Sequence, residues 1–152
     1  MNKAIYKARV FGPAGCQGSN RIVSNKHTGQ SMMIEASKDG RKWRGDMINS
    51  MLEDKPAAPF NEAMMVYLRV YISRPKAQYN SRGQLKPNAP KYPALKSKDV
   101  DKIQRSVGDA AKIAKWVTDD GLLNWYAIRY YTEDIAMPER TDVTMYSLEK
   151  FN

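Results

Sequence analysis

The sequence is poor in the residues on which many catalytic and structural sites depend. Among 152 residues there is one cysteine, Cys16, and one histidine, His27. A single cysteine cannot form an intrachain disulfide or a cysteine-based zinc site, so we expect a reducing compartment and a simple loop role for Cys16. Any Ser-His or Cys-His catalytic pair would depend on His27, which lies in the polar stretch SNKHTGQS and is expected to be a surface residue.

Long apolar runs are also missing. No stretch approaches the roughly 20 apolar residues that a membrane-spanning helix needs. The first nine residues lack the apolar run of a secretory signal. We therefore expect a soluble, cytoplasmic protein.

Acidic residues are fewer than basic ones. The chain has 25 Lys and Arg against 16 Asp and Glu, a formal net charge of +9. Such an excess favours a polyanionic partner such as DNA, because each neutralised phosphate releases a condensed counterion. A hydrophobic content of 42%, with three Trp and nine Tyr, is typical of a folded core, and the length fits one domain.

The hydrophobic pattern predicts a single α/β domain over residues 1–152, with elements in the order β-α-β-α-β-β and a mixed sheet flanked by helices. Apolar residues alternate on both faces of the third element, which predicts a central strand. The expected strands and helices are, in chain order, Ala4–Phe11 (strand), Ser37–Asp54 (helix), Glu62–Ser73 (strand), Val100–Lys115 (helix), Leu122–Tyr131 (strand) and Asp142–Leu148 (strand).

The two expected helices each have an apolar stripe. In the first, the buried face is expected to hold Trp43, Met47, Ile48, Met51 and Leu52. The loop before it, GPAGCQGSN, contains three glycines but lacks the Gly-Lys-Ser/Thr ending of a nucleotide-binding P-loop. We therefore do not expect a nucleotide site there.

Residues 74–98 have no clear periodicity and no acidic residue. Such a segment within a domain is usually functional or disordered, and a cationic arm would grip a DNA backbone without reading bases. Solubilising surface is the alternative. Tyr79 and Tyr92 are candidates for stacking on a base, although packing is the simpler role. The candidates for phosphate contacts are Arg74, Lys76, Arg82, Lys86, Lys91, Lys96 and Lys98.

Two pairs of aspartates stand out in this basic chain. Asp99 and Asp101 open the second expected helix, and Asp119 and Asp120 lie in the turn after it. Two or three convergent aspartates suffice to hold Mg²⁺, or Mn²⁺, which orients and activates water in phosphodiester hydrolysis. The alternative is structural, because aspartates are ordinary helix caps and turn residues.

One face of the second helix is expected to carry charge. Asp101, Arg105 and Asp109 fall at successive i,i+4 steps, opposite the apolar stripe. If these residues have no catalytic role, Arg105 and Asp109 are expected to form a solvated ion pair.

These residues resemble a known family. The segment YPALKSKDVDKIQRSVGDAA, followed by VTDDGLLNW, is similar to the signature of the RusA endonucleases, phage and prophage Holliday junction resolvases. In that signature Asp-x-Asp opens a helix, a basic residue follows one turn later, and an Asp-Asp turn precedes a strand. The resemblance extends to Gln17-Gly18-Ser19, Trp43-Arg44 and the segment RPKAQYNSRGQLKPNAPKYP, and covers roughly residues 4–148.

The resemblance implies an Mg²⁺-dependent homodimer, in the cytoplasm of a bacterial host, that makes paired symmetrical nicks in a four-way DNA junction. It implies Asp99, Asp101 and Asp120 as metal ligands, with Asp119 or Asp109 in support, and Arg105 as the group that stabilises the transition state. Lys102 and Arg105 depart from the best-studied pattern, which has Asn and Lys; Arg105 keeps the charge but changes its geometry. Lys102 joins the candidates for DNA contacts. The alternative functions are a flap or fork nuclease, and a DNA-binding protein of the same fold without catalysis.

Overall fold

The computed structural model describes residues 4–15, 20–35, 38–93 and 99–149. Cys16, Lys96 and Lys98 lie outside the described residues, and what was expected of them stays a prediction. Within the described part of the chain, no helix is long and apolar enough to cross a membrane.

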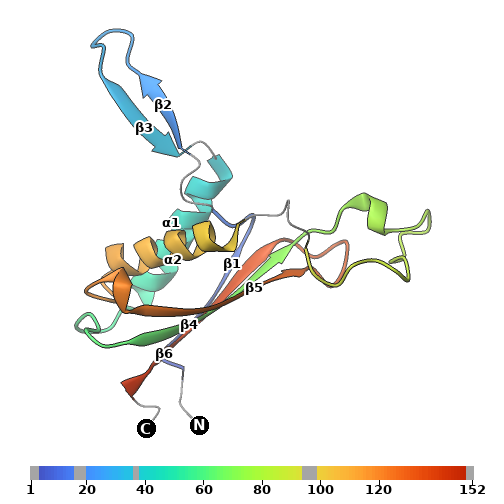
Figure 1. Ribbon diagram of the computed structural model, residues 1–152. Coiled ribbons are helices and arrows are strands. Elements are labelled where there is room, and N and C mark those ends of the chain that lie inside the picture. The colour runs from blue at the N-terminus through green and yellow to red at the C-terminus, as the bar shows by residue number, and fades with distance from the viewer. Residues whose placement is uncertain (1–3, 16–19, 36–37, 94–98, 150–152) are drawn as a thin grey trace.

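A mixed four-stranded sheet in the order β1-β6-β4-β5 forms the centre of the molecule (Figure 1). Strands β1 (Tyr6–Phe11) and β4 (Met64–Ile72) both pair antiparallel with β6 (Arg140–Ser147), and β4 pairs in parallel with β5 (Leu123–Tyr131). The expected α/β fold and the four expected strands are confirmed. As expected from its alternating apolar residues, β4 is an interior strand.

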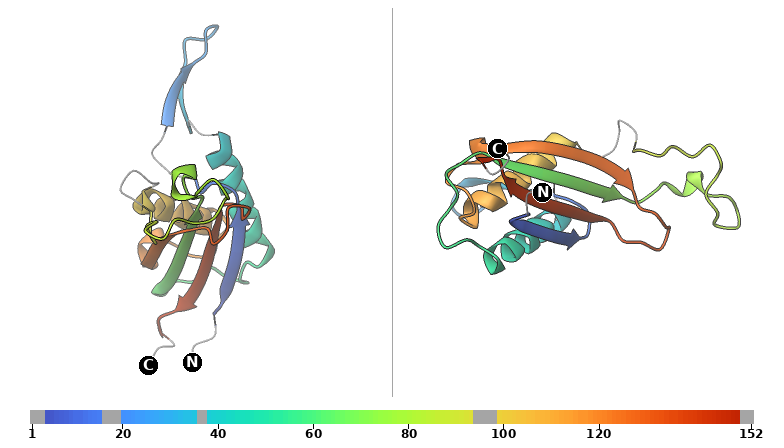
Figure 2. Two further views of the ribbon diagram at one scale, coloured as in Figure 1. Left: turned by 90° about the vertical axis from the view of Figure 1, so that its right-hand side faces the viewer. Right: turned by 90° about the horizontal axis from the view of Figure 1, so that it is seen from below.

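Two helices cover one face of this sheet, and the other face carries no helix among the described residues (Figure 2). Helix α1 (Lys38–Glu53) buries Trp43, Met47 and Met51 against the sheet, whereas Leu52 remains 44% exposed. The prediction that Leu52 lies on the buried face was therefore wrong. The buried stripe covers only part of the circumference of a helix, and Leu52 falls beside that stripe, where solvent reaches it.

Helix α2 (Val100–Ile113) packs beside α1, with a fully buried stripe that includes Ile103, Val107 and Ala110. It ends two residues earlier than predicted because Lys115 adopts a left-handed conformation, with φ of 57°. The backbone N–H of Trp116 donates to the carbonyl of Ala111, and that of Lys115 donates to Lys112. This pair of hydrogen bonds is a Schellman motif, which closes a helix.

The glycine-containing loop after β1 has a packing role. A Cβ atom at Gly15 would lie 2.9 Å from the carbonyl oxygen of Gly40 and 3.1 Å from the Trp43 ring. Only glycine therefore allows this loop to approach the first turn of α1 so closely.

A second, two-stranded sheet was not predicted. Strands β2 (Asn20–Ser24) and β3 (Ser31–Glu35) form a hairpin that projects from the body of the molecule beyond α1 (Figure 1). At its turn, the side-chain oxygen of Asn25 accepts from the backbone N–H of His27, and Gly29 has φ of 68°.

The basic segment forms a second projection, which we call the arm (residues 74–93). It contains the short 3-10 helix η1 (Lys76–Gln78) and an antiparallel bridge between Tyr79 and Leu85. Figure 1 shows it extending away from the sheet where β4 ends. The described part of the segment is thus a folded excursion between β4 and α2.

Candidate active site

Asp99 occupies the N-cap position of α2, but its carboxylate makes no capping hydrogen bond. Instead, Oδ2 lies 3.3 Å from Nζ of Lys102, and the Asp99 side chain is 54% exposed. An exposed ion pair of this kind contributes little to stability. The structural role proposed for Asp99 as a side-chain cap therefore does not apply.

Asp101 lies in the first turn of α2, on the outer face of the helix. Its carboxylate is 3.9 Å from Nη2 of Arg105, at the limit of an ion pair, and both side chains are more than half exposed. Negative charge is favoured at this end of a helix. The carboxylate therefore remains accessible to solvent and to a ligand.

Asp119 and Asp120 begin the short 3-10 helix η2 (Asp120–Leu122), which leads into β5. Oδ1 of Asp119 accepts a 2.7 Å hydrogen bond from the backbone N–H of Gly121, and this bond lowers the pKa of Asp119. Asp119 is thus the cap of this turn. Asp120 instead packs against α2, with its Cβ atom 3.6 Å from where a Cβ of Gly108 would lie.

These elements enclose an open pocket of about 180 Å³ between the outer face of α2, η2 and the start of β5. Gln104 and Gly108 follow Asp101 at helical spacings of three and seven residues, which places all three on one side of α2. The pocket thus brings together two of the predicted carboxylates and the predicted cation. Its lining residues are Asp101, Gln104, Arg105, Gly108, Asp120 and Trp125.

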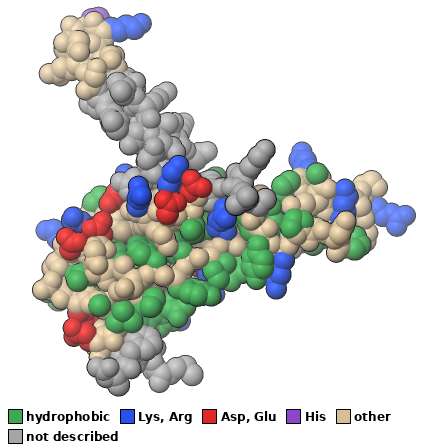
Figure 3. Space-filling view, viewed as in Figure 1, with side chains coloured by type: hydrophobic (Ala, Val, Ile, Leu, Met, Phe, Trp, Pro, Cys, Tyr) green, Lys and Arg blue, Asp and Glu red, His purple; other side chains and the backbone are tan. Residues whose placement is uncertain are grey.

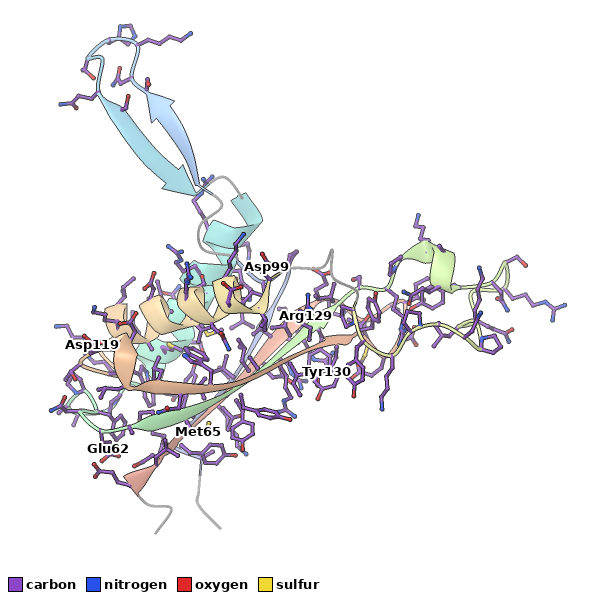
Figure 4. All side chains as sticks on the ribbon, in the orientation of Figure 1. Glu62, Met65, Asp99, Asp119, Arg129 and Tyr130 are labelled. Atoms are coloured by element: carbon purple, nitrogen blue, oxygen red, sulfur yellow. The ribbon has the colours of Figure 1, made fainter. Side chains whose placement is uncertain are left out.

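The other predicted ligands do not line this pocket. Figure 4 shows Asp99 at the start of α2 and Asp119 beyond the other end of the helix. In the described ranges, no three His, Cys, Asp or Glu side chains are close enough to hold one metal ion together. Asp109 is half-buried on α2 and does not line the pocket. The pocket therefore holds the carboxylates of Asp101 and Asp120, while Asp99 and Asp109 lie elsewhere along α2 and Asp119 lies at the start of η2.

The oxygen donors of this pocket fit a hard divalent cation. Mg²⁺ is commonly held by one or two carboxylates, with water and substrate phosphate in the remaining positions. The absence of sulfur and imidazole donors among the lining residues is consistent with magnesium or manganese rather than zinc.

Sequence reasoning missed Gln104, Gly108 and Trp125. The helical spacing from Asp101 was the available signal for Gln104 and Gly108. For Trp125 the available signal was the segment VTDDGLLNW, which it ends, but its place in the pocket depends on how β5 packs beside α2. A further cation from α1, Arg44, approaches the same helix, with Nε 3.5 Å from Oγ of Ser106.

The arm presents most of its predicted cations to solvent. Lys76, Arg82, Lys86 and Lys91 are exposed, whereas Arg74 is half-buried at the root. Figure 3 shows basic side chains along the arm, and basic and acidic side chains together over α2. Among the described residues, Lys76 and Arg82 have no side-chain hydrogen bond or ion pair.

His27 lies far from this region. It occupies the turn of the β2–β3 hairpin, and Figure 3 shows the histidine at the tip of that projection. The side chain is exposed, as expected for a surface histidine.

The face of the sheet that the helices leave open carries a cluster of aromatic side chains. The Tyr67 ring lies 5.2 Å from that of Tyr126 and 5.7 Å from that of Tyr146. Tyr67 is 40% exposed and Tyr126 is 53% exposed. We call Tyr67, Tyr126 and Tyr146 the aromatic cluster. Met65, labelled in Figure 4, lies on the same face of the sheet.

A second open pocket, of about 360 Å³, lies beside the aromatic cluster. Lys7, Arg9 and Arg69 line it together with Asp142. Arg9 is already engaged, since its guanidinium donates twice to the Asp142 carboxylate, at 2.8 and 3.0 Å. No predicted catalytic residue lines this pocket.

The sequence was compared with protein-family models and with curated proteins. The model of the family described as endodeoxyribonuclease RusA matches residues 13–146 of the chain. The match includes α2, η2, the pocket and the arm. The comparison with curated proteins returned no match.

Proposed function

Because the chain belongs to the RusA endodeoxyribonuclease family, we propose that it uses Mg²⁺ to resolve four-way DNA junctions by paired symmetrical nicks, during phage DNA recombination and repair. The family assignment makes the chain an endodeoxyribonuclease, and the family consists of metal-dependent nucleases that act on Holliday junctions. The observation that carries the proposal is the pocket in which Asp101 and Asp120 meet beside Arg105.

Asp101 and Asp120 are the proposed inner ligands of the metal. Asp99 is a further proposed ligand. Among the described residues its exposed side chain is paired with Lys102 alone, and we expect it to be able to turn along α2 toward Asp101. Asp119 supports the site by holding the turn that carries Asp120. When bound, Mg²⁺ supplies an activated water and neutralises charge on the scissile phosphate.

Arg105 is the proposed phosphate-binding group of the pocket. Its contact with Asp101 is long at 3.9 Å, so little is lost when the guanidinium turns toward a phosphate oxygen. There its N–H groups would stabilise the negative charge that grows on the phosphate in the transition state. Gln104 and the indole of Trp125 would form the walls against which the DNA backbone lies.

The cations around the pocket are proposed to hold the DNA. Lys102 sits one turn from Asp99, and the arm extends from the sheet on the side where α2 begins. Contacts from such groups to phosphates fix the position of a duplex without reading its sequence. This agrees with recognition of a branched shape.

We propose that the active form is a homodimer, because a junction with near-twofold symmetry needs two sites for paired nicks. The open face of the sheet is the proposed interface. Its aromatic cluster presents apolar surface that no described element covers, and tyrosine is enriched where proteins associate.

The first test is cleavage of a labelled four-way junction, a fork and a linear duplex, with Mg²⁺ or EDTA. We expect symmetrical nicks in the junction that require the metal. Asp101→Asn should lower cleavage by about 1,000-fold or more while junction binding is kept or tightened, because a negative charge near phosphates is removed. Asp46→Asn, which changes an exposed aspartate of α1 paired with Lys42, is the matched control and should cleave normally.

Three outcomes would redirect or contradict the proposal. Preference for the fork over the junction would favour the flap or fork nuclease. Binding without cleavage in every metal would favour a non-catalytic DNA-binding role, and cleavage by Asp101→Asn at the wild-type rate would contradict the ligand assignment.

A further inference from the structure

The arm is attached to the end of β5 on both faces of that strand. Tyr130 and Tyr131 are consecutive strand residues, so their side chains lie on opposite faces of the sheet. The arm has two limbs: an outgoing limb that begins at Arg74 and a returning limb that ends at residue 93. In the outgoing limb, the Arg74 guanidinium lies 4.7 Å from the Tyr131 ring centre. In the returning limb, the Tyr92 ring lies 5.9 Å from that of Tyr130, which Figure 4 shows at the root of the arm.

Arg74 also ties the two limbs to each other. Its Nη1 atom donates to Oε1 of Gln78 at 2.9 Å and to the carbonyl of Pro90 at 2.8 Å. Gln78 in turn donates to the hydroxyl of Tyr131 at 3.3 Å. The guanidinium therefore joins the outgoing limb, the returning limb and β5 at one point.

A second tie lies further out on the arm. Nζ of Lys86 donates to the carbonyl of Ala77 at 2.8 Å, and the backbone N–H of Lys86 donates to Gln78. Asn80 closes the end of the arm, because its side-chain oxygen accepts from the backbone N–H groups of Arg82 and Gln84. Thus the arm is crossed by hydrogen bonds from its root to its tip.

Four of the five cations of the arm fall into two groups; the fifth, Lys91, has its Nζ atom 5.6 Å from the centre of the Tyr92 ring. Arg74 and Lys86 donate to protein oxygens within the arm, whereas Lys76 and Arg82 are exposed and have no such partner among the described residues. Charge alone does not distinguish the groups. Their hydrogen bonds do.

We propose that Arg74 is a positioning residue that fixes the direction of the arm, and that Lys76 and Arg82 make its contacts with DNA phosphates. The inference rests on the proposed function, since it takes the arm to be a DNA-binding element. A planar guanidinium can stack on Tyr131 and donate to two oxygens at the same time; the point charge of a lysine cannot. Holding the arm in one direction before DNA arrives removes an ordering cost from binding.

Binding to a labelled four-way junction, measured in EDTA over a range of salt concentrations, separates the two roles. Arg74→Lys and Arg74→Ala should both weaken binding by about tenfold, the effect of losing roughly one hydrogen bond, with an unchanged salt dependence. Lys76→Ala and Arg82→Ala should each lower the slope of log K against log salt by about one.

A second measurement needs no DNA. In the free protein, Arg74→Lys should speed amide hydrogen exchange across the arm, including the amides of Gln84 and Lys86, and leave β4 protected. Lys76→Ala is the matched control, because Lys76 has no tie to lose, and its arm should exchange as in the wild type.

Normal junction binding by Arg74→Lys would show that only the charge matters and would overturn the inference. Unchanged exchange in the arm of that variant would do the same. If Lys76→Ala and Arg82→Ala kept the wild-type salt slope, the phosphate contacts would be refuted. Metal-dependent cleavage that is lost in Asp101→Asn would still uphold the proposed function in each of these cases.

Discussion

At the scale of single residues, the neighbours Asp119 and Asp120 differ in what they contact. Asp119 is engaged by the backbone N–H of Gly121, whereas Asp120 packs against Gly108 and opens into the pocket. One dipeptide thus contains an ordinary turn residue and a proposed metal ligand. A Cβ atom at Gly108 would lie 3.6 Å from the Cβ atom of Asp120, which is an ordinary van der Waals distance, so η2 packs closely against α2 at this point.

Arg105 provides a test of the proposed chemistry at this scale. Arg105→Ala should lower the rate of junction cleavage by about 100-fold or more, since removing one donor from a growing oxyanion typically costs that much. Arg105→Lys should retain more activity than Arg105→Ala, because it keeps the charge but loses the planar fork. Single-turnover cleavage with saturating protein measures this.

The matched control is Arg41→Ala, an exposed arginine of α1 that does not line the pocket. Equal rates for Arg105→Ala and the control would contradict a catalytic role for Arg105.

Two glutamates at opposite ends of the sheet predict opposite effects of acid on stability. A hydrogen bond from Arg140, whose side chain is only 8% exposed, lowers the pKa of Glu133 below its ordinary 4.5. A hydrogen bond with Glu62 raises the pKa of Glu149. Glu133 therefore stabilises the fold at a pH above its pKa in the unfolded chain, and this stabilisation is lost as the pH falls through its pKa in the folded protein. Glu149 stabilises the fold at low pH, and this stabilisation is lost as the pH rises through its pKa in the folded protein.

Glu133→Gln should therefore flatten the loss of stability on acidification, and Glu149→Gln should steepen it. Urea denaturation at a series of pH values from about 7 to 3 measures both. The same pH dependence of stability in the two variants would contradict the opposite pKa shifts given to Glu133 and Glu149.

The residues of the site could be predicted from sequence only in part. The spacing of Asp101, Arg105 and Asp109 indicated one charged face of a helix, and in the structure Asp101 and Arg105 are exposed on it, whereas Asp109 is half-buried. Which carboxylates meet depended on how η2 packs against Gly108, and no local pattern encodes such a tertiary contact. For the same reason the place of Trp125 in the pocket could not be predicted, although the family-like segment VTDDGLLNW contains it.

At the scale of elements, the end of α2 carries a strained residue. Lys115 has a left-handed backbone at a position where glycine is usual, and this conformation costs an L-residue roughly 1–2 kcal/mol. Lys115→Gly should raise the free energy of unfolding by about 1 kcal/mol, after part of the gain is lost to the greater freedom of glycine in the unfolded chain.

Lys112→Gly, three residues earlier in the last turn of α2, should instead destabilise by about 1 kcal/mol, because glycine is a poor residue within a helix. Urea denaturation of both variants measures the difference. Destabilisation by Lys115→Gly would contradict the inference that the left-handed backbone of Lys115 is strained.

The sequence predicted the strands and helices of the main sheet because each has a long and regular apolar period. Residues 20–35 gave no such signal, since each strand of the hairpin has only five residues and the turn between them is not the two-residue type that a sequence reveals best. The arm lacked periodicity for another reason. Its structure depends on bonds from side chains to backbone, such as those of Arg74 and Asn80.

At the scale of the whole molecule, the open sheet face predicts the oligomeric state. Tyr67→Glu would place a charge within the proposed dimer interface and should weaken dimerisation by about 100-fold or more. Leu52→Glu changes an equally exposed apolar residue on α1 and should leave the dimer intact. Sedimentation velocity over a range of protein concentrations measures both, and a wild-type monomer would refute the interface.

The strand order has a consequence for the making of the protein in the cell. Strand β6 comes after all the other strands in the chain, yet it lies inside the sheet, between β1 and β4. A nascent chain that ends before Arg140 leaves β1 without any partner and β4 with only one neighbour. Asp101 and Asp120 have by then been translated, but the sheet that supports them has not closed. Synthesis therefore delays the assembly of the proposed DNA-cutting centre until nearly the whole domain has left the ribosome.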